Sequence, residues 1–146
     1  MLSKRTQLCT DVLATIGSAP RGALVTAHAL ADKLSISVSH MESILRLLRE
    51  AGFVRSARGP GGGYCLACHP DQISIWSVVR AVETPEESLV PRSNCPNLTD
   101  SLEDLLDQAA KRYLCTRTIG EFVKTDLKWD TRHSGMRWAF GLGPKP

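Results

Sequence analysis

Aromatic residues and long apolar runs are both scarce in this chain of 146 residues. Only 5% of the residues are aromatic, which disfavours binding of single-stranded nucleic acid by stacking bases on aromatic rings. No apolar run approaches the roughly 18–20 residues that a membrane-spanning helix needs. The first residues, 1–7, lack the apolar core of a signal peptide. These absences predict a protein without a membrane partner, and we expect it in the cytoplasm.

Disulfide bonds and catalytic patterns are not expected either. The five cysteines would be mostly reduced in the cytoplasm, which disfavours a disulfide framework. The sequence contains no paired carboxylates and no nucleophile–base pattern, and the run Gly59–Gly63 lacks the lysine of a phosphate-binding loop. The sequence therefore predicts that the protein is not an enzyme.

The chain does have a strongly uneven distribution of charge around its net charge of +3. Residues 1–63 hold eight Lys or Arg and four Asp or Glu, residues 84–110 hold one basic and six acidic residues, and residues 111–146 hold eight basic and three acidic residues. A basic first half suits a phosphate backbone. The acidic stretch should instead face solvent or a protein partner.

One amphipathic helix is predicted over about residues 37–51. Ser37 or Ser39 can cap its N-terminus, and Gly52 stands where a glycine would end it. Its apolar face has the helical spacing of i, i+3, i+4 and i+7 and consists of Met41, Ile44, Leu45 and Leu48. The opposite face carries polar and basic residues, which suits a helix that lies between a core and a charged partner.

A glycine-tipped hairpin is predicted directly after this helix. Residues 53–57 and 64–66 have the composition of short strands, and Gly59–Gly63 between them must turn. Together with a short helix over residues 27–34, capped by Thr26, the pattern is that of a winged helix-turn-helix. In that fold the longer helix enters the major groove of DNA, and the hairpin, or wing, lies along the backbone or minor groove.

The remaining elements complete a mainly α-helical fold with a two-stranded β wing. We expect a first helix over residues 4–18, a fourth helix capped by Ser74, and a long C-terminal helix that begins at Thr99 or Ser101. One small domain leaves little core to cover the apolar face of that helix, which favours a dimer contact. We divide the chain into a DNA-binding domain (1–83), a sensor-type loop (84–98), a dimerisation helix with a closing segment (99–123) and a tail (124–146) that is either disordered or covers a partner's surface.

A resemblance to a known family appears in the run S-V-S-H-M-E-S-I-L-R-L-L-R-E-A-G-F-V-R-S-A-R-G-P-G-G-G-Y, residues 37–64. This run resembles the Rrf-two family of bacterial transcription regulators. Residues 73–83 and 118–123 resemble the family's next helix and its closing segment, so the likeness covers about residues 1–123. The resemblance implies a homodimer in which the long helices cross, and in which two recognition helices meet successive major grooves of a near-palindromic, double-stranded operator.

The resemblance also implies the residues that contact DNA and the partner subunit. The DNA-binding residues on the helix and the wing are Ser37, Ser39, His40, Glu42, Arg46, Arg58, Gly59, Pro60, Gly61, Gly62 and Gly63. Hydroxyls can reach phosphates or base edges, a carboxylate can accept a hydrogen bond from cytosine N4, and an arginine can enter a narrow minor groove. The implied dimer interface consists of Leu102, Leu105, Leu106, Ala109 and Tyr113.

The sensing site is where the chain departs from the family pattern. Cluster-binding members place three cysteines in the loop before the long helix, whereas this loop contains only Cys95. Aligning back from the closing segment puts Asp100 near the place where some members have a histidine ligand. One thiolate cannot hold an iron–sulfur cluster, which usually needs four protein ligands. We therefore expect no cofactor and no metal, and leave open a cluster shared across the dimer with other ligands.

A second group of cysteines follows the wing. Cys65, Cys68 and His69 match the C-x-x-C-H pattern of covalent haem attachment. They could alternatively form a redox-responsive thiol pair, contribute to a zinc site that lacks a nameable fourth ligand, or only end a strand. Haem at this position would obstruct DNA, so the candidate sensor thiols remain Cys95, Cys65 and Cys68.

These observations predict a homodimeric, sequence-specific DNA-binding regulator that is responsive to redox state or to a ligand. We expect repression rather than activation, because a dimer that covers a promoter blocks polymerase without further contacts. Two alternatives belong to other classes. One is a protein-interaction module that uses the acidic long helix without binding DNA, and the other is an electron carrier that uses the cysteine group after the wing.

Overall fold

The structure is a computed structural model that describes residues 3–20, 22–83, 98–123 and 136–138. Cys95, the loop 84–97 and most of the 124–146 tail lie outside these residues. The elements in chain order are α1 (Lys4–Gly17), β1 (Ala23–Val25), α2 (Ala27–Leu34), α3 (Val38–Glu50), β2 (Val54–Ala57), β3 (Gly63–Leu66), the 3-10 helix η1 (Pro70–Gln72), α4 (Ile75–Glu83), α5 (Leu98–Thr116), the 3-10 helix η2 (Ile119–Phe122) and β4 (Met136–Trp138).

The core lies between α1, α2, α3 and α4 and the inner face of the sheet. The four apolar residues predicted for the inner face of α3 are all buried, at 2% exposure or less. Val12, Leu13 and Ile16 of α1 and Ile75, Val78 and Val79 of α4 pack into the same cluster. Burial of aliphatic side chains of this size stabilises a fold by about 1.5–3 kcal/mol each, so the helical periodicity in the sequence identifies the residues that hold the domain together.

The helix boundaries follow from local hydrogen-bonding chemistry. Thr26 caps α2 by accepting from the Ala29 amide at 3.1 Å, and Ser74 accepts from the Ser77 amide at 3.1 Å at the start of α4. Gly52 adopts a φ of +80° just after α3, a conformation that favours glycine. The caps predicted from the sequence are therefore present.

The sheet is larger than the two-stranded wing that we predicted. Its antiparallel strands lie in the order β2–β3–β1–β4. Strand β1 pairs with β3 through Val25 and Tyr64 and with β4 through Ala23 and Trp138. Neither β1 nor β4 was predicted, because three residues are too few to show an alternating pattern, and all three residues of β1 are buried.

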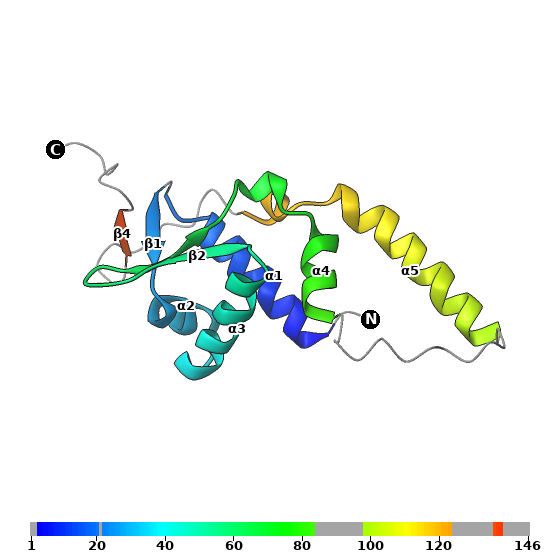
Figure 1. Cartoon of the computed structure of the whole chain (residues 1–146), viewed down its shortest axis with the longest axis horizontal. Coiled ribbons are helices and arrows are strands. Elements are labelled where there is room, and N and C mark those ends of the chain that lie inside the picture. The colour runs from blue at the N-terminus through cyan, green and yellow to red at the C-terminus, as the bar shows by residue number, and fades with distance from the viewer. Residues whose placement is uncertain (1–2, 21, 84–97, 124–135, 139–146) are drawn as a thin grey trace.

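Helix α5 extends away from the rest of the molecule, at the opposite end from the β2–β3 hairpin (Figure 1). It begins at Leu98, one residue before the predicted start. Its C-terminal end leads into η2, where the Ile119 amide donates to the Ile73 carbonyl at 2.9 Å. None of the helices in the described ranges is long and apolar enough to cross a membrane.

Candidate nucleic-acid interface

The polar side of α3 is fully presented to solvent. Ser37 caps this helix, accepting from the His40 amide at 3.2 Å. The exposed residues along the helix are Ser39, His40, Glu42, Ser43, Arg46, Arg49 and Glu50. Because the apolar side of α3 is packed into the core, the helix can offer only this polar side to a partner.

The connection between α2 and α3 fixes the position of α3. Ser35 ends α2 with a φ of 55°, a left-handed conformation that is uncommon for residues other than glycine. The Ile36 amide then donates to the Ala31 carbonyl at 3.0 Å, and Ile36 packs against the core. This tight, anchored turn gives α2 and α3 the arrangement of a helix-turn-helix.

The turn of the β2–β3 hairpin depends on its glycines. The Gly62 amide donates to the Gly59 carbonyl at 2.9 Å, and Gly59 and Gly61 have φ values of +96° and +78°. A Cβ atom on Gly62 would collide with the Ala57 carbonyl oxygen, and one on Gly63 would lie 2.8 Å from the Val25 carbonyl oxygen. The glycines therefore allow a compact tip that leaves Arg58 exposed.

Helix α3 and the hairpin together carry four arginines, which are Arg46 and Arg49 on α3 and Arg55 and Arg58 on the hairpin. All four are exposed. Within the described parts of the chain, none of them has a carboxylate partner. Unpaired guanidinium groups suit the phosphates of a nucleic-acid backbone.

The predicted DNA-binding residues lie at the start and on the polar side of α3 and at the tip of the β2–β3 hairpin, which follows α3 directly in the chain. Arg55 was missing from the predicted set. Strand β2 shows no alternation that could have identified it, because Val54 is buried and the three residues that follow it are all exposed. The contacts of all these residues with DNA remain a prediction.

The Rrf2 family, described as "Iron-dependent Transcriptional regulator", matches residues 2–124. The chain belongs to the Rrf2 family. It is 33% identical over 106 residues, 68% of this chain and 72% of the relative, to the Neisseria meningitidis protein NMA1593, which carries the name of an HTH-type transcriptional regulator. It is also 30% identical over 100 residues, 63% of this chain and 72% of the relative, to the regulator CymR of Bacillus subtilis.

Solved structures share the fold of this Rrf2 chain. The structure of B. subtilis CymR superposes with a TM-score of 0.70 at 22% identity, covering 84% of this chain and 95% of CymR. The predicted fold class is thereby confirmed in its coarser form, as a mainly helical winged-helix protein with a small antiparallel sheet. The family also supports the predictions of a DNA-binding transcription regulator and of a protein that is not an enzyme.

The family description raises the question of iron in this Rrf2 chain. Nowhere in the described residues do three His, Cys, Asp or Glu side chains gather as metal ligands would, and this includes Cys65, Cys68 and His69. The loop 84–97 contains Cys95 as its single cysteine. These donors do not fit a cluster that needs four ligands from one chain.

The four cysteines in the described part of the chain are free thiols in different surroundings. Burial raises the pKa of Cys9 to about 11, so this thiol is unreactive at neutral pH. Cys65 is half-buried on β3, and its pKa is also raised by burial, although the charge of Arg55 opposes this effect. Cys68 and Cys115 are exposed and are the more accessible thiols.

Proposed function

We propose that this Rrf2 protein is a homodimeric repressor that binds a near-palindromic, double-stranded DNA operator. Helix α3 enters the major groove, where Ser39, His40 and Glu42 reach base edges, while Arg46 contacts the backbone. The β2–β3 hairpin lies along the adjacent backbone or minor groove with Arg58 at its tip. The observation that carries this proposal is the exposed polar face of α3, followed by a hairpin with exposed arginines that have no carboxylate partner among the described residues.

The apolar side of α5 supports the dimer. Leu102, Leu105, Leu106 and Tyr113 are between 52% and 70% exposed, and Ala109 on the same side is exposed too. These residues fall on one side of the helix at i, i+3, i+4, i+7 and i+11 spacing. A second copy of α5 offers the same apolar stripe in return, as a two-fold interface requires.

The DNA-binding part of the proposal is tested by selecting tight sites from a random duplex library and measuring affinity by fluorescence anisotropy. We expect affinity to fall steeply with salt. Arg46→Ala removes one phosphate contact from each subunit of the dimer, so it should lower the slope of log affinity against log salt by about two units. Lys111→Ala is the matched control, since Lys111 is an exposed cation of α5 and its removal should leave the slope unchanged. If the selection yields no preferred sequence, or if DNA binding does not depend on salt, the protein-interaction module is favoured instead.

We further propose that the regulator responds to a thiol or ligand signal rather than to a family-type iron–sulfur cluster. The support is the single Cys95 in the loop and the scattered cysteines elsewhere. Anaerobically purified protein should be colourless and free of iron and sulfide. Visible charge-transfer absorption together with iron would overturn this proposal and would indicate a cluster with unusual ligands.

A further inference from the structure

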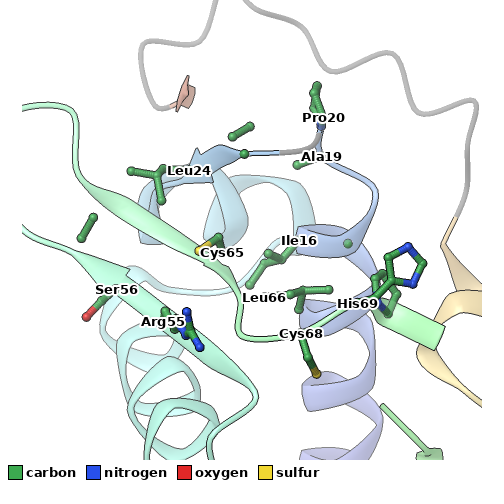
Figure 2. Close-up of a pocket in the computed structure, with 15 residues that line it drawn as sticks. Ile16, Ala19, Pro20, Leu24, Arg55, Ser56, Cys65, Leu66, Cys68 and His69 are labelled. Atoms are coloured by element: carbon green, nitrogen blue, oxygen red, sulfur yellow. The ribbon is translucent and has the colours of Figure 1, made fainter. Parts of the chain in front are cut away.

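A cavity of about 620 Å³ lies between the base of the hairpin and the C-terminal end of α1. Figure 2 shows Arg55 and Cys65 on the hairpin side of this cavity and Ile16, Ala19 and Pro20 on the α1 side. Its volume falls within the range of about 300–1,000 Å³ that is common for small-molecule sites. The cavity is open on one side, so a ligand could enter without unfolding the core.

The lining of the cavity is apolar, with few polar groups. Aliphatic side chains such as Ile16, Leu24 and Leu66 form most of its surface. The polar groups come from Arg55, Cys65, Cys68 and His69, with Ser56 beside them. A mainly apolar wall with a few polar groups is the usual composition of a site that binds an organic molecule.

The charge of the lining has one sign. Among the described lining residues none is acidic, and Arg55 has no carboxylate partner within the described parts of the chain. Arg55 pairs across the hairpin with Cys65, and its positive charge reaches the Cys65 thiol. His69 at the rim is already engaged, because its Nδ1 lies 3.3 Å from the Asp71 carboxylate. The free guanidinium therefore offers its paired donors to a carboxylate or sulfonate group of a ligand.

The cavity also touches the parts of the molecule that would respond to a ligand. Two of its walls are the strands β2 and β3, which continue into the hairpin tip that carries Arg58. Another wall includes Gly17 and Pro70, and a Cβ atom on Gly17 would lie within 3.3 Å of Val123, Leu66 and Pro70. A bound molecule would therefore contact both the hairpin and the C-terminal end of α1.

We propose that this cavity is an effector site for a small organic anion with an apolar body, such as an aromatic or branched carboxylate, and that its occupancy changes DNA affinity through the hairpin. Arg55 binds the anionic group, and the aliphatic walls bury the apolar body. The binding step stands independently of the proposed function, whereas the effect on DNA rests on it.

The binding step is tested on the full chain with two fluorescent probes of similar shape. 8-Anilinonaphthalene-1-sulfonate carries an anionic group, and N-phenyl-1-naphthylamine lacks it. We expect Arg55→Gln to weaken binding of the sulfonate by about tenfold, as for the loss of one charge-assisted hydrogen bond, and to leave binding of the neutral probe unchanged. Arg49→Gln is the matched control, because Arg49 is an exposed arginine outside the cavity lining.

The location of the probe is tested separately by amide chemical-shift perturbation. The sulfonate should shift the resonances of Leu24, Cys65 and Leu66, and Cys65→Phe, which places a ring in the cavity, should abolish these shifts. Circular dichroism checks that Cys65→Phe still folds. If it does not fold, the sulfonate affinity of Arg55→Gln decides whether the probe binds in this cavity. Equal sulfonate affinity in wild type and Arg55→Gln, or shifts confined to α5, would overturn the proposed site.

The effect on DNA is measured by anisotropy with the selected duplex at a saturating concentration of the sulfonate. We expect the dissociation constant to change about threefold or more in the wild type and to stay constant in Arg55→Gln. If the probe binds but the dissociation constant for DNA does not change, the effector role is overturned, whereas the proposed binding site is still supported. If no duplex binds the probe-free protein, the proposed function fails instead, and the two failures are distinguishable.

Discussion

Glu83, the last residue of α4, accepts a hydrogen bond from the Thr6 hydroxyl on α1 at 2.8 Å, across 77 positions of the chain. The same carboxylate oxygen accepts from the Ser3 amide at 2.7 Å, and the Thr6 side chain is fully buried. Burial alone raises the pKa of Glu83, but the hydrogen bonds from Ser3 and Thr6 outweigh it and lower the pKa. Glu83 therefore ties the end of α4 to the start of α1.

Replacing this carboxylate should destabilise the fold in a pH-dependent way. Because the pKa of Glu83 is lower in the folded state, its contribution is present above the ordinary value of 4.5 and is lost as the pH falls through the lowered folded pKa. We expect Glu83→Ala to reduce the free energy of unfolding by about 1 kcal/mol at neutral pH, since the site is partly open to solvent. Urea unfolding at pH 7 and at about pH 3 measures the difference.

Glu83→Gln is the control for this prediction. It keeps an acceptor oxygen for Ser3 and Thr6 but carries no charge, so it should be less destabilising than Glu83→Ala. At a pH below the lowered folded pKa the wild type is protonated as well, and the gap in unfolding free energy between wild type and Glu83→Gln should then close. A gap of the same size at both pH values would show that charge has no part in this contact.

Ser37 has two separable roles, as the cap of α3 and as a predicted DNA contact. Ser37→Ala removes the acceptor for the His40 amide and should cost about 1 kcal/mol of stability. Ser37→Asp keeps a capping oxygen, so stability should be retained, while its negative charge near the DNA phosphates should weaken operator binding by about tenfold. Thermal unfolding and anisotropy on the same two variants separate the roles.

Thr26→Ala controls for the loss of a cap alone. Thr26 caps α2 in the same way and is outside the predicted DNA-binding set. We expect it to lower stability to a similar extent and to leave operator affinity unchanged. If Ser37→Asp bound the operator as tightly as the wild type, the N-terminus of α3 would not lie near the DNA backbone.

The sequence predicts the helices of this fold well because each carries local signals. Helix α3 has a capping serine, a four-residue apolar stripe and a terminating glycine, and all three are where they were expected. Strands β1 and β4 were missed because their pairing is a long-range contact between segments of three residues. The left-handed conformation of Ser35 within the turn was not predicted, since nothing in a serine itself predicts that conformation.

The candidate sites also differ in whether local sequence signals or long-range contacts form them. The polar face of α3 and the hairpin tip follow from periodicity and from a run of glycines, so their residues could be named in advance. The cavity beside Arg55 and Cys65 could not, because it is formed where the hairpin, β1 and the end of α1 meet. Cys65 and Cys68 were noticed only as a motif, whereas the structure places both at the wall of this cavity.

The apolar stripe of α5 should hold the dimer together. Leu106 is 70% exposed, and a charge placed there would have to be buried against a second copy of the helix. We expect Leu106→Glu to shift the protein from dimer to monomer in sedimentation-velocity experiments at micromolar concentration, and to lower operator affinity because two half-sites are no longer bound together.

Gln108→Glu is the matched control for this change. It introduces the same charge two residues away, on an exposed position of α5 that lies outside the apolar stripe. The control should remain a dimer with unchanged operator affinity. A Leu106→Glu protein that sediments as the wild type does would place the subunit contact elsewhere.

Two glycines of the hairpin tip should differ sharply in their tolerance of a methyl group. A Cβ atom on Gly62 would meet the Ala57 carbonyl oxygen and would lie 3.0 Å from the Gly59 carbonyl oxygen, whereas one on Gly59 meets nothing within 4 Å. Gly59→Ala therefore introduces only the strain of its positive φ, about 1–2 kcal/mol. Gly62→Ala must open the turn itself, because neither carbonyl can move without breaking the hairpin.

We expect Gly62→Ala to weaken operator binding by about tenfold and Gly59→Ala by clearly less, because only the first displaces Arg58 and the tip from the DNA. The buried core lies away from this turn, so both variants should still fold, with the thermal midpoint of Gly62→Ala lowered more than that of Gly59→Ala. Anisotropy with the selected duplex and thermal unfolding measure both quantities. Tight operator binding by Gly62→Ala would mean that DNA is recognised by α3 without the hairpin.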